Sequence, residues 1–121
     1  DNYFVPLSKP HNTEIPALLD KNNIKYTIGI LYKTISRSFS DPEDFDYDIL
    51  VFYSPSGIKS LKENFPEFIQ GDIKIAAFGP TTISAVQQEG LRVDIDAPNV
   101  KAPSMTMALD NFLKEYNRNL K

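Results

Sequence analysis

The residues best suited to chemistry in this chain are small hydroxyl side chains in two short segments of similar design. Residues 54–57 have the sequence Ser-Pro-Ser-Gly, and residues 79–82 have the sequence Gly-Pro-Thr-Thr. Each segment follows an apolar run, and each opens a stretch with helical periodicity. A turn from a strand into a helix presents unpaired backbone N–H groups and the positive end of the helix dipole. The two segments therefore predict a surface that binds the carboxylates or phosphates of an anionic ligand.

The candidate ligand contacts in the first segment are Ser54, Ser56 and Gly57, through hydroxyl and backbone N–H groups. Thr81 and Thr82 offer the same chemistry in the second segment, where we expect one hydroxyl to cap the helix and the other to face the ligand. Capping alone also explains Ser and Thr at these positions, because both are common N-cap residues. At the level of sequence, the capping and ligand-binding interpretations both stay open.

The apolar runs that precede the two segments predict strands. We expect these strands over 49–53 and 74–78. Within them, residues 49–52 and 75–78 are continuously apolar rather than alternating, which is typical of strands buried on both faces of a parallel sheet. We expect the remaining elements to be helices over 56–64, 81–89 and 104–117, and a strand over 92–97. Strands that alternate with helices predict an α/β fold with three layers, doubly wound and flavodoxin-like. Ligands of such sheets bind beyond the carboxyl ends of the strands, where both hydroxyl segments lie.

The N-terminal part of the chain predicts a smaller β-α-β segment. Residues 3–5 and 24–35 are rich in β-branched and aromatic residues and are expected to form strands, with a helix between them. Residues 36–48 are polar and predict a connection with a short helical turn at 42–45. The expected organisation is a segment over 1–35, the connection over 36–48 and an α/β domain over 49–121.

The connection lacks the central glycine and terminal glutamate of a calcium loop, so its acidic residues predict a solvated loop. These residues are Asp41, Glu43, Asp44, Asp46 and Asp48.

Composition and charge exclude several functional classes. The net charge is −3 and the pI is about 5.1, so no basic excess exists for binding nucleic acid or a membrane surface. The sequence has no cysteine for a thiolate nucleophile, a disulfide or a zinc-thiolate site. No apolar run approaches the roughly 20 residues of a membrane span, and no basic-then-apolar leader is present, so we expect a cytoplasmic protein. The chain has no glycine-rich nucleotide loop, and with His11 as its one histidine it has no Ser-His-Asp pattern.

Four segments, taken in order, form a more specific pattern. They are Ile-Leu-Tyr-Lys-Thr at 30–34, Phe-Tyr-Ser-Pro-Ser-Gly at 52–57, Ala-Ala-Phe-Gly-Pro-Thr-Thr at 76–82 and Glu-Gly-Leu at 89–91. This pattern resembles the C-terminal half of the uroporphyrinogen-III synthase family. The resemblance implies two α/β domains with the active site in the cleft between them, and no metal or organic cofactor. It implies a hydro-lyase of haem biosynthesis that cyclises the linear tetrapyrrole hydroxymethylbilane, inverting the last pyrrole ring and losing water. The many carboxylates of that substrate agree with the predicted anion-binding surface.

The resemblance also implies roles for residues outside the hydroxyl segments. Tyr32 matches a tyrosine at the family's cleft, where a protonated phenol could donate a proton to the departing hydroxyl group. The alternative is a strand tyrosine that only packs against the sheet. Lys9 lies in the first loop, residues 8–12, and is expected to pair with a substrate carboxylate, although this loop lacks the glycine and arginines that the family often carries there. His11, in the same loop, is expected to be a surface residue.

In the family, one domain is inserted into the other. Residues 3–30 resemble the end of the inserted domain, 32–38 the return linker, and 48–121 the larger part of the split domain. The resemblance therefore implies that this chain is the C-terminal part of such an enzyme and is inactive alone. The sheet of the split domain would then lack its first strands, and the apolar edge left without them predicts self-association of the chain. The competing hypothesis is a non-catalytic α/β module that binds another anion or a protein partner. A receiver-like signalling domain is disfavoured, because no acidic pair follows a strand.

Overall fold

The computed structural model of the chain describes residues 1–9, 13–38 and 46–120. The predicted helical turn at 42–45 and the predicted surface position of His11 lie outside these residues. Of the acidic connection, Asp46 and Asp48 are described, and both are exposed. The chain forms two compact units, Asp1–Ile35 and Ser36–Lys121.

The first unit is a two-stranded parallel sheet with one helix. Strand β1 (Tyr3–Lys9) pairs with β2 (Tyr26–Lys33), and α1 (Glu14–Lys21) connects them. Strand β1 is longer than the predicted 3–5, because Pro6 is tolerated in a strand whose second edge carries no partner in the described residues. Strand β2 is shorter than the predicted 24–35, because its pairing extends only from Tyr26 to Lys33.

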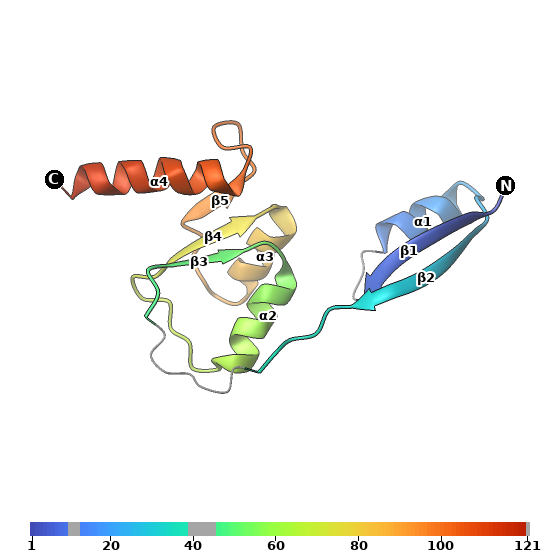
Figure 1. Ribbon diagram of the computed structural model, residues 1–121, viewed down its shortest axis with the longest axis horizontal. Coiled ribbons are helices and arrows are strands. Elements are labelled where there is room, and N and C mark those ends of the chain that lie inside the picture. The colour runs from blue at the N-terminus through green and yellow to red at the C-terminus, as the bar shows by residue number, and fades with distance from the viewer. Residues whose placement is uncertain (10–12, 39–45, 121) are drawn as a thin grey trace. The chain divides into compact units, whose positions relative to one another are not determined.

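The second unit contains three parallel strands in the order β3-β4-β5, each followed by a helix (Figure 1). The strands are β3 (Ile49–Phe52), β4 (Lys74–Phe78) and β5 (Ile95–Ala97). The helices are α2 (Pro55–Asn64), α3 (Pro80–Gln88) and α4 (Met105–Asn119). The prediction of an α/β fold is confirmed. Gly90 follows α3 with φ of 70°, as the predicted end of that helix requires.

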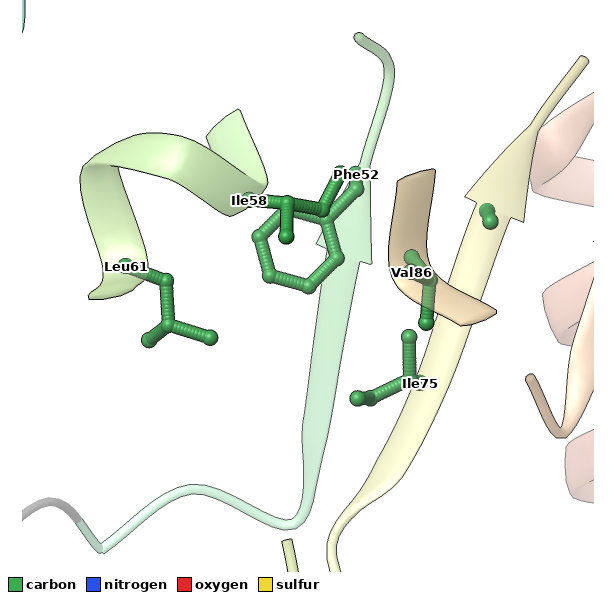
Figure 2. Close-up of a cluster of buried hydrophobic side chains, with 6 residues drawn as sticks. Phe52, Ile58, Leu61, Ile75 and Val86 are labelled. Atoms are coloured by element: carbon green, nitrogen blue, oxygen red, sulfur yellow. The ribbon is translucent and has the colours of Figure 1, made fainter. Parts of the chain in front are cut away.

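One face of this sheet packs against α2 and α3. Phe52 and Ile75 extend from β3 and β4 toward Ile58 and Leu61 of α2 and Val86 of α3 (Figure 2). All five side chains are buried, and burial of each large apolar side chain contributes about 1.5–3 kcal/mol.

The opposite face packs against α4. Ala76 of β4 points away from its neighbour Ile75, because successive strand side chains alternate between faces. It joins a second buried cluster with Ile95, Met105 and Ala108. Helices therefore cover both faces of the sheet, which gives the three layers of the doubly wound arrangement.

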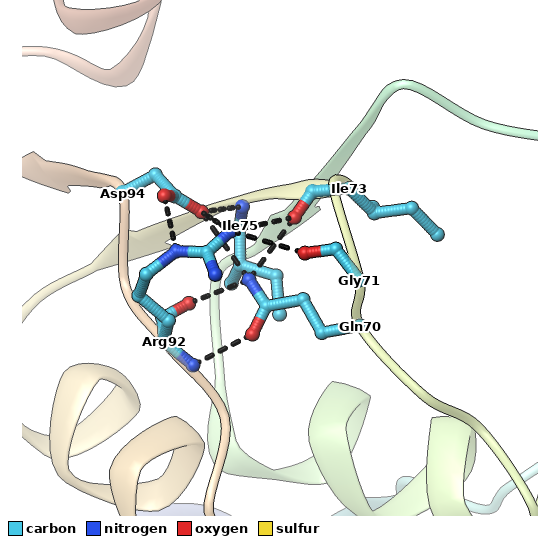
Figure 3. A network of polar contacts seen from close by, with 6 residues as sticks. All are labelled: Gln70, Gly71, Ile73, Ile75, Arg92 and Asp94. Carbon is cyan, nitrogen blue, oxygen red and sulfur yellow. Dashed lines mark hydrogen bonds and ion pairs between the residues drawn. The ribbon is translucent and has the colours of Figure 1, made fainter.

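The last strand is shorter than the predicted 92–97, and a polar network explains why (Figure 3). Gln70 Oε1 accepts the backbone N–H of Arg92 at 2.7 Å, and Gln70 Nε2 donates to the Arg92 carbonyl at 3.0 Å. Both backbone groups of Arg92 are therefore satisfied by a side chain rather than by a neighbouring strand. Regular pairing with β4 begins at Ile95.

Candidate anion-binding site

The two hydroxyl segments lie at the same edge of the three-stranded sheet. Phe52 of β3 lies opposite Ala77 of β4, so Ser54 and Gly79 each follow this matched pair by two residues. The backbone N–H of Gly79 donates to the carbonyl of Ala97 at 2.6 Å, which ties the end of β4 to the end of β5. The carboxyl ends of all three strands, and the helices that follow them, therefore meet at one edge.

At the first segment, Ser54 is the N-cap residue of α2, but its side chain makes no capping hydrogen bond. Its Oγ instead lies 2.7 Å from Oγ of Ser56. The expectation that the Ser54 hydroxyl caps the helix is therefore wrong. A hydroxyl pair uses one proton internally and leaves the other proton free to donate. Together with the Ser56 backbone N–H, which has no acceptor within the first helical turn, the pair offers two donors to an anion.

Gly57 has a packing role in the same turn. A Cβ atom at this position would lie 3.1 Å from the Phe52 ring, which is closer than ordinary van der Waals contact. The absence of a side chain thus allows α2 to approach β3 closely. The backbone N–H of Gly57 already donates to the Ser54 carbonyl at 3.1 Å, so it is not an open donor.

At the second segment, the helix begins one residue earlier than predicted, with Gly79 as the N-cap. Gly79 has no side chain, so the expectation that Thr81 or Thr82 caps α3 is wrong: both lie inside the first turn. Thr82 is buried, with 2% of its surface exposed, whereas Thr81 is exposed. Of the two hydroxyls, only that of Thr81 is well placed to reach a ligand. The Thr81 backbone N–H lies in the first turn, where no intrahelical acceptor is available.

The third helix at this edge differs from the other two. Ser104 precedes α4, and its Oγ accepts the backbone N–H of Met107 at 3.2 Å. The N-terminus of α4 is thus closed by its own side chain. At the N-termini of α2 and α3 no side chain accepts a first-turn N–H, so the N–H groups of Ser56 and Thr81 stay available.

An aromatic pair next to the two segments was not identified from the sequence. Tyr53 and Phe78 are the residues immediately before Ser54 and Gly79, and their ring centroids lie 5.8 Å apart at an interplanar angle of 35°. The Tyr53 side chain is exposed. An exposed aromatic side chain, in contact with a second ring, therefore borders the polar donors. The sequence signal was available: two aromatic residues end neighbouring strands of one parallel sheet.

Tyr32 and Lys9 lie in the first unit, at the carboxyl end of its two strands. Tyr32 is exposed on β2 opposite Ser8, and Lys9 is the last residue of β1 rather than a loop residue as predicted. Lys9 lies opposite Lys33, so two ammonium groups share one face of the sheet. Like charges in directly opposed strand positions repel, and an anion between them would relieve that repulsion. Lys33 was missed by sequence reasoning, which treated Lys9 alone.

Comparison with known protein families adds an independent observation. Residues 1–107 match the family described as Uroporphyrinogen-III synthase HemD. This chain belongs to the uroporphyrinogen-III synthase family. The resemblance drawn from the four sequence segments is thereby confirmed.

The uroporphyrinogen-III synthase family consists of lyase-type enzymes of tetrapyrrole synthesis, which act on a small-molecule substrate. A search of curated proteins finds no match to the chain. In the part of the chain that the structure describes, no helix has both the length and the apolar character needed to cross a membrane.

Proposed function

We propose that this chain takes part in the cyclisation of hydroxymethylbilane to uroporphyrinogen III. In this reaction the terminal hydroxyl group leaves as water, the last pyrrole ring is inverted, and the macrocycle closes with release of a proton from the attacked pyrrole carbon. No oxidant or reductant is consumed. The observation that carries the proposal is the pair of helix N-termini, α2 and α3, that lack side-chain caps at one sheet edge of a chain in this family.

The donors at this edge suit the carboxylates of such a substrate. Ser54, Ser56 and Thr81 are exposed hydroxyl residues, and the first-turn N–H groups of both helices add to them. Hydrogen bonds to a charged group contribute about 1.5–3 kcal/mol each, so a few of them would hold a carboxylate without a lysine or arginine. Residues 54–57 and 79–82 contain no such cation.

The aromatic pair of Tyr53 and Phe78 suits the pyrrole rings of the substrate. Pyrrole rings are flat and π-rich, and offset or tilted contacts between aromatic rings contribute about 0.5–1.5 kcal/mol beyond burial. The exposed Tyr53 ring, backed by Phe78, would therefore support a pyrrole ring whose carboxylate side chain reaches Ser54.

Tyr32 is the proposed proton donor to the departing hydroxyl group. The exposure of this side chain leaves its hydroxyl accessible to a ligand, as a proton donor requires. Lys9 and Lys33 would pair with substrate carboxylates on the other face of the same strands. The carbon that loses hydroxide is stabilised by its pyrrole ring, so positioning of the chain of rings contributes to the rate alongside proton donation.

A coupled assay tests the proposal. Hydroxymethylbilane is generated in situ, and the ratio of type III to type I uroporphyrin is read by chromatography. The assay is run on this chain and on the longest form of the protein that its gene encodes. Type III product from either sample supports the proposal, and type III from the longer form alone means that this chain supplies part of the active site. Type I product only, the spontaneous outcome, from both samples overturns it in favour of a non-catalytic binding module.

A further inference from the structure

The start of the connection between β2 and β3 is held on α2 by side-chain hydrogen bonds. Ser36 Oγ donates to Ser60 Oγ at 2.9 Å, and Asn64 Nδ2 donates to the Arg37 carbonyl at 2.9 Å. Asn64 Nδ2 also donates to the Ser60 carbonyl at 2.9 Å, so both protons of the amide have an acceptor. All four residues belong to the second compact unit. Two successive residues of the connection are therefore fastened to the C-terminal half of α2.

This contact lies close in the chain to Tyr32. The backbone N–H of Thr34, just after β2, donates to the Lys9 carbonyl at 2.8 Å and so remains part of the first unit. Ile35 follows with 71% of its surface exposed, and Ser36 is already bound to α2. The stretch of chain between the strand that carries Tyr32 and the helix is therefore short.

The helix that holds the connection also begins at the candidate anion-binding site. Ser54 and Ser56 lie at the N-terminus of α2, and Asn64 is its last residue. A helix rises about 1.5 Å per residue, so Asn64 lies about 12 Å along the axis from Ser56. One rigid element thus presents the hydroxyl pair at one end and holds the chain that follows Tyr32 toward the other.

We propose that Ser60 and Asn64 are positioning residues, which clamp the chain after Tyr32 to the helix of the hydroxyl pair. This role rests on the proposed function, in which Tyr32 and the hydroxyl pair act on one substrate. A short free stretch of chain raises the effective concentration of one group near the other and lowers the entropy lost when both engage the substrate. Opening the clamp would extend the free stretch beyond Arg37. It would lower kcat without removing any group that touches the substrate.

Limited digestion with trypsin tests whether the clamp forms. Trypsin cleaves after arginine and lysine, and Asn64 binds the carbonyl of the peptide bond that follows Arg37. Asn64→Ala should raise the rate of cleavage after Arg37 about threefold to tenfold, as loss of one exposed hydrogen bond predicts. Cleavage after Lys101 in the same digest is the reference. Gln88→Ala is the matched control, because Gln88 is the last residue of α3 and donates to Ser84 Oγ at 3.2 Å, also one helical turn earlier.

Substitutions at Ser60 separate the hydrogen bond from the side chain's bulk. Ser60→Ala removes the acceptor for Ser36 Oγ and should also speed cleavage after Arg37. Ser60→Thr keeps the hydroxyl group and should leave the cleavage rate near that of the unaltered protein. Circular dichroism checks that each variant folds.

The coupled assay, run on the form of the protein that makes type III product, tests the positioning role. Asn64→Ala and Ser60→Ala should lower kcat about threefold to tenfold, whereas Ser60→Thr and Gln88→Ala should retain it. In a protein that already carries Tyr32→Phe, Asn64→Ala should have little further effect, because the clamp acts through Tyr32.

Three results would overturn the inference at different points. Cleavage after Arg37 that is no faster in Asn64→Ala than in Gln88→Ala overturns the clamp. Faster cleavage with an unchanged kcat, or an equal loss of kcat with and without Tyr32→Phe, overturns the positioning role. Type I product alone from the unaltered protein overturns the proposed function and the positioning role with it, whereas the digestion still decides whether the clamp forms.

Discussion

The hydroxyl oxygens of Ser54 and Ser56 lie 2.7 Å apart, and the Ser54 side chain does not cap the helix that it precedes. A serine at an N-cap position normally accepts a backbone N–H bond from the first turn. Here the two side chains hydrogen-bond to each other, and the Ser56 backbone N–H receives no side-chain cap. Helix capping therefore does not explain the Ser54 side chain, and the role that we propose for the pair is ligand binding.

Ser54→Ala and Ser56→Ala should each lower the kcat/KM for type III product roughly tenfold or more, because each removes a bond to a charged group that contributes about 1.5–3 kcal/mol. Their melting temperatures should stay near that of the unaltered protein. The control is Ser104→Ala, which removes a real cap and should lose about 1 kcal/mol of stability while activity is retained. The reverse pattern, stability lost and activity kept at Ser54, would contradict the assignment. Thermal denaturation and the coupled assay provide the two readouts.

Gly79→Ala should destabilise the protein through backbone strain alone. Gly79 has φ of 84° and ψ of 156°, a conformation that side-chain-bearing residues rarely adopt, and no atom lies within 4 Å of a Cβ placed there. The expected loss in the free energy of unfolding is about 1–3 kcal/mol, measured by urea denaturation. Gly90→Ala is the comparison, since its φ of 70° suits the ordinary left-handed end of a helix and should cost about 1 kcal/mol. Equal losses at both positions would show that the Gly79 backbone is no more strained by a side chain than the left-handed backbone of Gly90.

Asp94→Asn should change how stability depends on pH. Burial by itself raises the pKa of Asp94, but the hydrogen bond from Arg92, the backbone N–H of Ile75 and the charges of Arg92 and Lys74 lower it overall. A carboxyl group whose pKa is lower in the folded state stabilises the protein above its unfolded value of about 3.9. This contribution is lost as the pH falls through the lower, folded value.

The Asp94→Asn protein should therefore be less stable than the unaltered protein at neutral pH, and the difference should shrink in acid below about pH 4. Urea denaturation at several pH values measures it. Asp110→Asn is the control, because Asp110 pairs with Lys114 on the exposed surface of α4, where such pairs contribute only about 0–1 kcal/mol. A pH-independent difference for Asp94→Asn would mean that packing, not charge, explains its effect.

Tyr32→Phe should lower kcat for type III product by at least about tenfold, because general acid groups commonly contribute that much or more. Stability should change by less than about 0.5 kcal/mol, since the side chain is exposed. Tyr3→Phe is the matched control, because Tyr3 is an exposed tyrosine on the adjacent strand. Full activity of the Tyr32 variant would place the residue in packing rather than in proton transfer.

The strands and helices of the second unit followed from local pattern. Apolar runs predicted the parallel strands β3 and β4; β4 is buried as expected, whereas β3 is only partly buried and exposes Val51. Helices α2 and α3 were predicted as well, and each begins one residue earlier than expected, at Pro55 and at Pro80. The end of β5 was predicted and its start was not. Gln70 binds the backbone of Arg92 from 22 positions away in the sequence, and local pattern does not contain that contact.

The candidate site likewise combines features that the sequence determines with features that only the tertiary structure decides. The sequence by itself determined which residues have useful chemistry, because hydroxyls, prolines and glycines at strand–helix junctions are local features. Only the tertiary structure decided which hydroxyls are available: Thr82 is buried, Ser54 pairs with Ser56, and Ser104 is the one that caps. It also paired Tyr53 with Phe78 and Lys9 with Lys33. These relationships depend on which strands lie side by side and in what register, which nonlocal packing sets.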